Sequence, residues 1–258
     1  MTMGATTAVL WAEWTKIRTI SSSMWTLTAA FFSTIGLGAL LSVILGGEFD
    51  TLGAAEQAAF DPVMTSFIGM GLGQLAMITF GVLVVSSEYG TGMIRTTLAA
   101  VPQRGLLYCA KAAAAAVPGL AVGMATSVAT FFVGQALLGD HGASLGDPGV
   151  LRAVTGAGVY LTLMLLFAVG VATMLRKAVL SLSVLMAYFF MIAPIFNFVP
   201  ATRKVGYFFP DQAGTSVMQV VQQADGPPYG PWAGLGIMAL WAAASLAGGY
   251  FALKRNDA

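Results

Sequence analysis

Six apolar stretches alternate with shorter polar segments along the chain. They cover residues 25–45, 63–85, 112–138, 153–175, 178–199 and 232–253. Each is at or near the ~20 residues that a helix needs to cross about 30 Å of hydrocarbon. Only Arg176 and Lys177 separate the fourth stretch from the fifth, so these two predict a tight hairpin. The pattern predicts an all-α integral membrane protein in which six transmembrane helices form a single domain over residues 1–258.

Two segments outside the spans have patterns of their own. Residues 8–20 place Trp11 and Trp14 beside Lys16 and Arg18, a composition typical of a helix that lies along the membrane interface. The connection 200–231 contains a partly apolar piece, residues 205–221, that proline interrupts and that is too short to span. We expect this piece to form a re-entrant or interfacial helix pair.

The longest polar interruption on the side predicted to be cytoplasmic is residues 86–111. Its centre, residues 92–101, predicts a short amphipathic helix that begins after Gly90 and Gly92 and ends before Pro102. Arg95 lies on the polar side, and the apolar face carries Met93, Ile94, Thr97, Leu98 and Val101. Two interpretations stay open: a helix that rests on lipid headgroups, or a rod that docks into a groove of a soluble partner.

The distribution of charge predicts the orientation of the helices. With the N-terminus inside, nine of the twelve lysine and arginine residues lie on the inner side, and eight of the eleven acidic residues lie outside. Short cytoplasmic connections are enriched in lysine and arginine. Both termini are therefore predicted to be cytoplasmic.

Composition excludes several classes of protein. The chain is 57% hydrophobic and only 9% charged, which excludes an ordinary soluble domain. Its net charge of +1 gives no reason to expect a nucleic acid partner. The single cysteine, Cys109, excludes an intrachain disulfide and a multi-cysteine metal site, and we expect no metal site.

The predicted spans contain almost no ionisable side chain. Because a charge in mid-bilayer is costly and usually functional, this argues against a proton relay, an ion-coupled carrier or an intramembrane hydrolase. Gln74 and Asn197 are the most polar candidates for a substrate path, although either could equally join two helices. Pro118 and Pro194 predict kinks within spans.

Two GxxxG pairs lie in the spans. Gly69 and Gly73 form the first pair, and Gly119 and Gly123 form the second. Such pairs let two helices approach closely, and ordinary helix packing is the expected role here.

Motifs for catalysis are missing from the sequence. It contains no G-x-x-x-x-G-K-[ST], so no P-loop would bind ATP in this chain. It also lacks H-E-x-x-H and G-x-S-x-G. We therefore expect no enzymatic activity and no cofactor in this chain.

The stretch EYGTGMIRTTLAAVPQR at residues 88–104 carries a resemblance to a known family. Together with AEWTKIRT at residues 12–19, the six spans and the long outer connection, it resembles the membrane subunits of type 2 ABC exporters. The similarity is greatest to permeases whose ATPase is a separate chain, and it extends over the whole sequence.

The resemblance implies roles for particular segments. Residues 92–101 would be the coupling helix that seats in the ATPase, and residues 8–20 the connecting helix, with Trp11, Trp14, Lys16 and Arg18 as its marker residues. Residues 205–221 would gate release, so Phe208 and Phe209 join Gln74 and Asn197 as candidates for the path or gate. The coupling contacts implied are Glu88, Tyr89, Met93, Ile94, Arg95, Thr97, Leu98 and Val101.

The resemblance also implies partners. Two permease chains, expected as a homodimer, would work with two ABC ATPase subunits that bind ATP and Mg²⁺, in a lipid bilayer that is the plasma membrane. An almost charge-free interior suits export of a hydrophobic or amphipathic cargo, such as a drug-like molecule in multidrug export, a peptide or a lipid. The strongest alternative is a membrane anchor or sensor that recruits a soluble partner without transport; an ion-coupled carrier lacks a coupling site.

Overall fold

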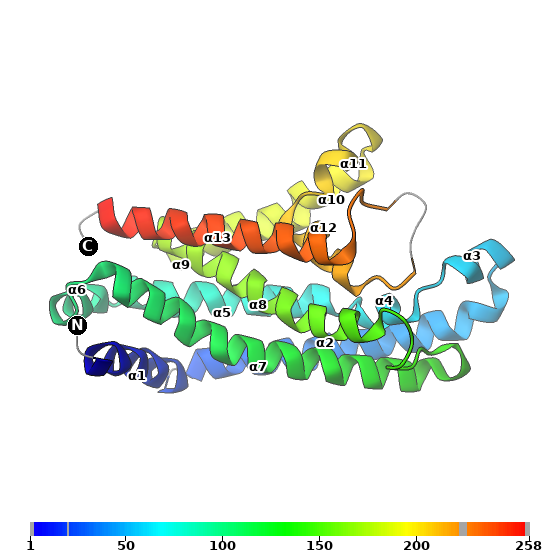
Figure 1. Ribbon diagram of the computed structural model, residues 1–258, viewed down its shortest axis with the longest axis horizontal. Coiled ribbons are helices and arrows are strands. Elements are labelled where there is room, and N and C mark those ends of the chain that lie inside the picture. Colours follow the sequence, from blue (N-terminus) through cyan, green and yellow to red (C-terminus); the bar gives the residue numbers. More distant parts are fainter. Residues whose placement is uncertain (1–2, 20, 222–225, 256–258) are drawn as a thin grey trace.

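The structure is a computed structural model that describes residues 3–19, 21–221 and 226–255. Within this part of the chain every regular element is helical, and six helices are long and apolar enough to cross a membrane. Figure 1 shows these helices running side by side along the long axis of the molecule. The prediction of an all-α membrane protein with six spanning helices is confirmed. The spans are Met24–Thr51, Met70–Gly90, Arg104–His141, Val150–Leu175, Ala178–Phe198 and Pro231–Arg255.

The first helices cover the N-terminal half of the chain. They are α1 (Met3–Thr19), α2 (Ser21–Glu48), α3 (Ala54–Ala59), α4 (Pro62–Phe67), α5 (Met70–Gly90), α6 (Met93–Ala100) and α7 (Arg104–Leu138). The remaining helices are α8 (Val150–Leu175), α9 (Ala178–Ala187), α10 (Ala193–Phe198), α11 (Pro200–Gly206), α12 (Pro210–Thr215) and α13 (Pro231–Arg255). Short 3-10 turns follow α2, α7 and α12, at Phe49–Thr51, Gly139–His141 and Ser216–Met218.

Helix α8 is the centre of the bundle. It packs against α5, α7 and α13, while α2 closes the bundle against α5 and α7. The side chains of Tyr160, Leu161 and Leu165 on α8 are fully buried. Since α8 contacts three of the other spanning helices along its length, its position fixes where those helices lie.

Both GxxxG pairs mediate close helix approach, as predicted. A side chain on Gly69 would collide with the carbonyl oxygen of Thr34 on α2, and one on Gly73 would collide with the Thr34 hydroxyl. Gly119 and Gly123 of α7 face α8, where an added side chain would come within 2.8 Å of Leu165 and of the carbonyl oxygen of Gly158. Small residues therefore set the spacing of α2 from α5 and of α7 from α8.

The boundaries of two predicted spans differ from the structure. The predicted span 63–85 is divided into α4 and α5 by a turn at Ile68 and Gly69, where the backbone of α2 approaches most closely. Helix α5 continues to Gly90, and α7 begins at Arg104 instead of Ala112. These helices continue through polar residues because helical hydrogen bonding does not depend on lipid. The polar side chains of these extensions find partners within the protein.

The fifth span changes its helical form before Pro194. Between α9 and α10, residues Tyr188–Ile192 form a π-helical turn. Proline has no amide hydrogen to continue the α-helical pattern, and a wider turn accommodates it.

The predicted helix pair at 205–221 consists of α12 and the 3-10 turn Ser216–Met218. This pair folds back onto α8 and α13, and Val217 and Met218 are fully buried. The segment that follows is fastened to the bundle, because the amides of Val220 and Val221 donate to Oδ2 of Asp61 at 2.6 and 2.9 Å.

One end of the bundle gathers the polar elements. This end contains the start of α1, the whole of α6 and the end of α13 (Figure 1). The charge distribution predicts that it is cytoplasmic, and we call it the inner end. The guanidinium groups of Arg104 and Arg176 donate to carbonyl oxygens in the last turn of α13, each at 3.0 Å. These bonds satisfy acceptors that a helix end leaves free.

Replacement of Gly69 by alanine is expected to destabilise the bundle by about 1–3 kcal/mol, because the added methyl group must displace the backbone of α2. The matched control is Gly71→Ala, where the added carbon meets nothing within 4 Å. Unfolding of the purified variants in mixed detergent micelles measures the difference. Equal stability of the two variants would contradict the close approach.

Candidate functional site

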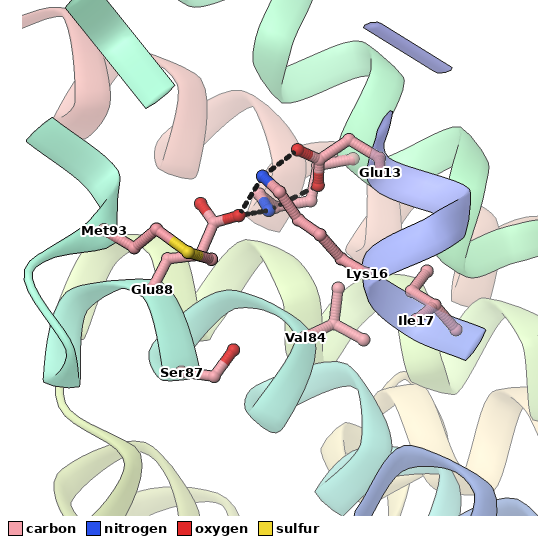
Figure 2. Close-up of a pocket in the computed structure, with 8 residues that line it drawn as sticks. Glu13, Lys16, Ile17, Val84, Ser87, Glu88 and Met93 are labelled. Atoms are coloured by element: carbon pink, nitrogen blue, oxygen red, sulfur yellow. Dashed lines mark hydrogen bonds and ion pairs between the residues drawn. The ribbon is translucent and has the colours of Figure 1, made fainter. Parts of the chain in front are cut away.

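Four charged side chains meet at the inner end, beneath α6. Glu13 and Lys16 come from α1, three residues apart and so on the same face of the helix. Glu88 lies in the last turn of α5, and Lys111 lies two turns into α7. Figure 2 shows Glu13, Lys16 and Glu88 pointing toward one another, and Lys111 is ion-paired with both glutamates. We call this set the charge ring.

Four ion pairs close the charge ring, in which positive and negative side chains alternate. The ammonium of Lys16 lies 2.6 Å from Oε1 of Glu13 and 2.6 Å from Oε1 of Glu88. The ammonium of Lys111 lies 2.6 Å from Oε2 of Glu13 and 2.8 Å from Oε1 of Glu88. Each charge therefore faces two charges of the opposite sign, and the set is neutral.

Burial makes these pairs interdependent. The side chains of Glu13, Glu88 and Lys111 are 3%, 2% and 7% exposed, whereas that of Lys16 is 26% exposed. Charges removed from water are costly unless they are paired, so none can leave the ring without stranding its partners. A cavity of about 20 Å³, the size of one water molecule, adjoins the ring.

The exposed member of the ring, Lys16, has a shifted pKa. Burial by itself lowers the pKa of this ammonium, but hydrogen bonds and attraction to Glu13 and Glu88 outweigh it, and the pKa is raised above 10.5. The charged form is therefore the stable form at physiological pH.

Helix α6 lies directly against this ring. Gly92 makes the turn out of α5 with a left-handed backbone (φ 72°), which glycine adopts without strain. Met93, the first residue of α6, lines the cavity beside the ring (Figure 2). The predicted short helix is confirmed, with Gly92 and Val101 as its caps.

The apolar face of α6 is turned into the protein. Ile94 is buried against Val9 of α1 and Leu107 of α7, and Leu98 and Val101 pack against the same cluster. Ile94 is thus buried within the chain, whereas Leu98 and Val101 are only partly covered, and the coupling role of the three side chains stays a prediction. The exposed side of α6 carries Met93, Arg95, Thr96, Ala99 and Ala100.

The other predicted coupling residues are divided between the ring and its surroundings. Tyr89 is half-buried, and the guanidinium of Arg176 lies over its ring at 5.6 Å from the centroid. Thr97 is also half-buried and donates to the carbonyl of Met93 at 3.0 Å. Arg95, implied with Glu88 as a coupling contact, is exposed and lies outside the ring.

The marker residues of α1 lie on two sides of that helix. Trp11 and Trp14 line an apolar groove of about 410 Å³ against Val117 and its neighbours on α7. Arg18 is exposed, whereas Lys16 belongs to the ring. Helix α1 therefore combines a lipid-compatible aromatic side with a charged side that locks onto α5 and α7.

Sequence reasoning missed two of the four ring residues, Glu13 and Lys111. Glu13 lies within the predicted interfacial helix 8–20, and Lys111 directly precedes a predicted span. No local pattern connects the two positions.

The four candidates for a substrate path or gate do not form one site. Gln74 accepts a hydrogen bond from the hydroxyl of Tyr160, so it joins α5 to α8. Asn197 lines an outer cavity of about 460 Å³. Phe208 is exposed beside Tyr229, whereas Phe209 packs against aromatic rings of α10 and of the π-helical turn.

Among the described residues, no group of three or more histidine, cysteine, aspartate or glutamate side chains is placed to hold a metal ion. His141 stacks on Phe49 with ring centroids 4.2 Å apart, and its Nε2 lies 3.8 Å from Asp50. These contacts give the histidine a structural role between two outer connections.

Comparison with known proteins adds no family. A scan against models of protein families finds no match, and a search of curated proteins finds no relative. The arguments for function therefore come from the geometry of this chain and from the resemblance of its residues 88–104.

Removal of one lysine from the ring is expected to destabilise the inner end. Lys111→Met leaves two buried carboxylates with one ammonium, and we expect a loss of about 3 kcal/mol in the free energy of unfolding. Unfolding in mixed micelles measures it, with Lys177→Met at an exposed position as the control. Adding Glu13→Gln to Lys111→Met restores the neutrality of the ring. The double variant should therefore lose less unfolding free energy than the sum of the losses of the two single variants. Full additivity would contradict the coupling of the four charges.

The pH dependence of stability follows from Lys16. Its pKa is higher in the folded chain than the ordinary 10.5, so its stabilising contribution is intact below that pH. The contribution is lost as pH rises from about 10.5 through the raised value. Melting followed by circular dichroism between pH 8 and pH 11 should show a steeper fall for the wild type than for Lys16→Arg, since guanidinium stays charged. Identical profiles would refute this role.

Proposed function

We propose that this chain is the membrane-spanning permease subunit of an ATP-driven exporter. A separate ABC ATPase subunit binds ATP and Mg²⁺, and two copies of each chain assemble in the plasma membrane. The cargo is hydrophobic or amphipathic, as the apolar interior favours. The resemblance of residues 88–104 to such permeases first suggested this function, and the arrangement of the inner end supports it.

The observation that carries the proposal is the attachment of α6. This short helix presents an exposed side with Arg95, Thr96 and Ala99, and its other side is packed against α1 and α7. A helix resting on lipid headgroups would turn its apolar side to the membrane; here that side is used inside the protein. The exposed polar side is suited to contact a soluble protein.

The attachment also provides a route for force. A push on α6 reaches α5 through the turn at Gly92, and it reaches α1 and α7 through Ile94. The charge ring joins the same three helices, and separating them would strand buried charges. Movement of α6 therefore moves the inner ends of α1, α5 and α7 as one unit.

Transport follows from the resulting shift in packing. ATP binding closes the ATPase pair, and its motion tilts the unit of α1, α5 and α7 relative to α8. The close contacts through Gly69 and Gly119 allow helices to slide with little side-chain rearrangement. Cargo is then released on the outer side as the bundle alternates between two packings.

The second candidate is a membrane anchor or sensor that recruits a soluble partner through the same exposed side of α6. It shares the docking surface but requires no alternation between packings. An ATPase as the bound partner favours the exporter, and a soluble partner of another kind favours the anchor.

Charge reversal on the exposed side of α6 is expected to abolish the complex. Arg95→Glu combined with Ala99→Asp leaves the buried face of α6 unchanged and should reduce co-purification with a candidate ABC ATPase at least tenfold. Arg203→Glu, an exposed arginine at the other end of the molecule, is the matched control.

The variants are first checked for an unchanged melting temperature, so that loss of the complex reports the surface and not the fold. If the doubly substituted chain retains the ATPase as well as the control does, α6 is not the docking element. If the wild-type chain binds no ATPase, the anchor or sensor replaces the exporter.

A further inference from the structure

A carboxylate lies inside the bundle at a depth that its position in the sequence does not reveal. Asp211 follows the proline that begins α12, and it is only 8% exposed. The next turn of α12 lies against the ring of Tyr160, because a side chain on Gly214 would collide with that ring. Tyr160 lies ten residues into α8, about 15 Å from the outer end of that helix. Sequence analysis placed Asp211 in an outer connection; the structure carries it inward.

This carboxylate has hydrogen-bond donors but no counter-charge. The hydroxyl of Tyr188 donates to Oδ1 at 3.4 Å, and the side-chain amide of Gln212 donates to Oδ2 at 3.1 Å. None of the ion pairs between described residues involves Asp211. Burial raises the pKa of this carboxyl above its ordinary value, and the neutral hydrogen bonds only partly oppose that effect. A buried anion of this kind is stabilised strongly when a cation approaches it.

Aromatic rings cluster around Tyr188, the tyrosine that donates to this carboxylate. The ring of Tyr188 lies 5.7 Å from that of Phe209 and 4.9 Å from that of Phe189. Phe209 in turn lies 4.9 Å from Phe196. The face of an aromatic ring attracts a cation, and a group of rings beside a carboxylate suits an organic cation with apolar substituents. A divalent metal ion needs six or more oxygen ligands, which one carboxylate does not provide.

The carboxylate adjoins the lining of the outer cavity. The side chain of Gln212 donates to Asp211 and also lines the cavity of about 460 Å³. This cavity lies on the side to which an exporter releases its cargo. Arg203 lines the same cavity, so a cation that passes through it meets one positive charge.

We propose that Asp211 and the aromatic rings of Tyr188 and Phe209 bind the positively charged group of a lipophilic organic cation, and that such cations are the cargo of the exporter. That the bound cation is the cargo rests on the proposed function. The binding of the cation is a property of this chain alone. It narrows the expected hydrophobic or amphipathic cargo to one sign of charge.

The test is binding of tetraphenylphosphonium to the purified chain in detergent, without an ATPase, by isothermal titration calorimetry against a micelle-only blank. Tetraphenylborate has nearly the same shape and the opposite charge, so it controls for apolar partitioning. The wild-type chain should bind the cation saturably and the anion only as the micelles do. Asp211→Asn should weaken binding of the cation about tenfold or more.

Three further variants separate a binding role from a structural one. Asp140→Asn makes the same change at an exposed acid and should leave binding unchanged. Tyr188→Phe keeps the ring and should retain binding, whereas Tyr188→Leu removes the ring and should weaken it. Melting temperatures identify any variant that does not fold. If Asp211→Asn is unfolded, the comparison of Tyr188→Phe with Tyr188→Leu decides whether this position binds the cation.

Two outcomes would overturn the inference: no saturable binding of tetraphenylphosphonium by the wild-type chain, or equal binding by the wild type and a folded Asp211→Asn. Either result leaves the permease proposal intact if the ATPase still co-purifies. Conversely, cation binding without any ATPase partner would establish the site and refute the exporter.

Discussion

The inner end of this protein depends on one electrostatic constraint, the neutrality of a buried ring of two glutamates and two lysines. Each ammonium lies within 2.8 Å of two carboxylate oxygens, and three of the four side chains are almost wholly removed from water. Such a set is stable only when complete, because any vacancy leaves a charge without compensation in a medium of low polarity. The three helices that supply it must therefore keep a fixed register, and α6 rests on that rigid base.

The outer end is held together differently. There the contacts are hydrogen bonds from neutral groups to single carboxylates, with Asp61 receiving the amides of Val220 and Val221 and Asp211 receiving Tyr188 and Gln212. Neutral hydrogen bonds exchange readily with water or with a ligand, whereas the ion pairs of the inner end do not. The two ends therefore differ in the kind of polar contact that joins their helices.

Hydropathy predicted the six spans because length and apolarity alone decide whether a helix can cross lipid, and Gly92 and Pro102 predicted the limits of α6. The pattern showed that Ile94 and Leu98 share a face, but it carried no information on whether that face meets the protein or a partner. The ring was out of reach because Glu13 and Lys111 are 98 residues apart. The re-entrant piece that contains Asp211 was predicted, but its depth was not, because the depth of a short helix depends on how a connection folds back, which no local signal records.

The charge ring and the bond from Val220 to Asp61 close chain segments of different length. The charge ring draws only on α1, α5 and α7, so everything it needs has been synthesised once the third span is complete. The bond from Val220 to Asp61 joins residues 159 apart and must wait for α8 to α12. Closing the longer loop also costs more chain entropy. The bonds that fasten Arg104 and Arg176 to the end of α13 need the last helix of the chain. The charge ring is therefore the one of these contacts that can form while the second half of the chain is still being made.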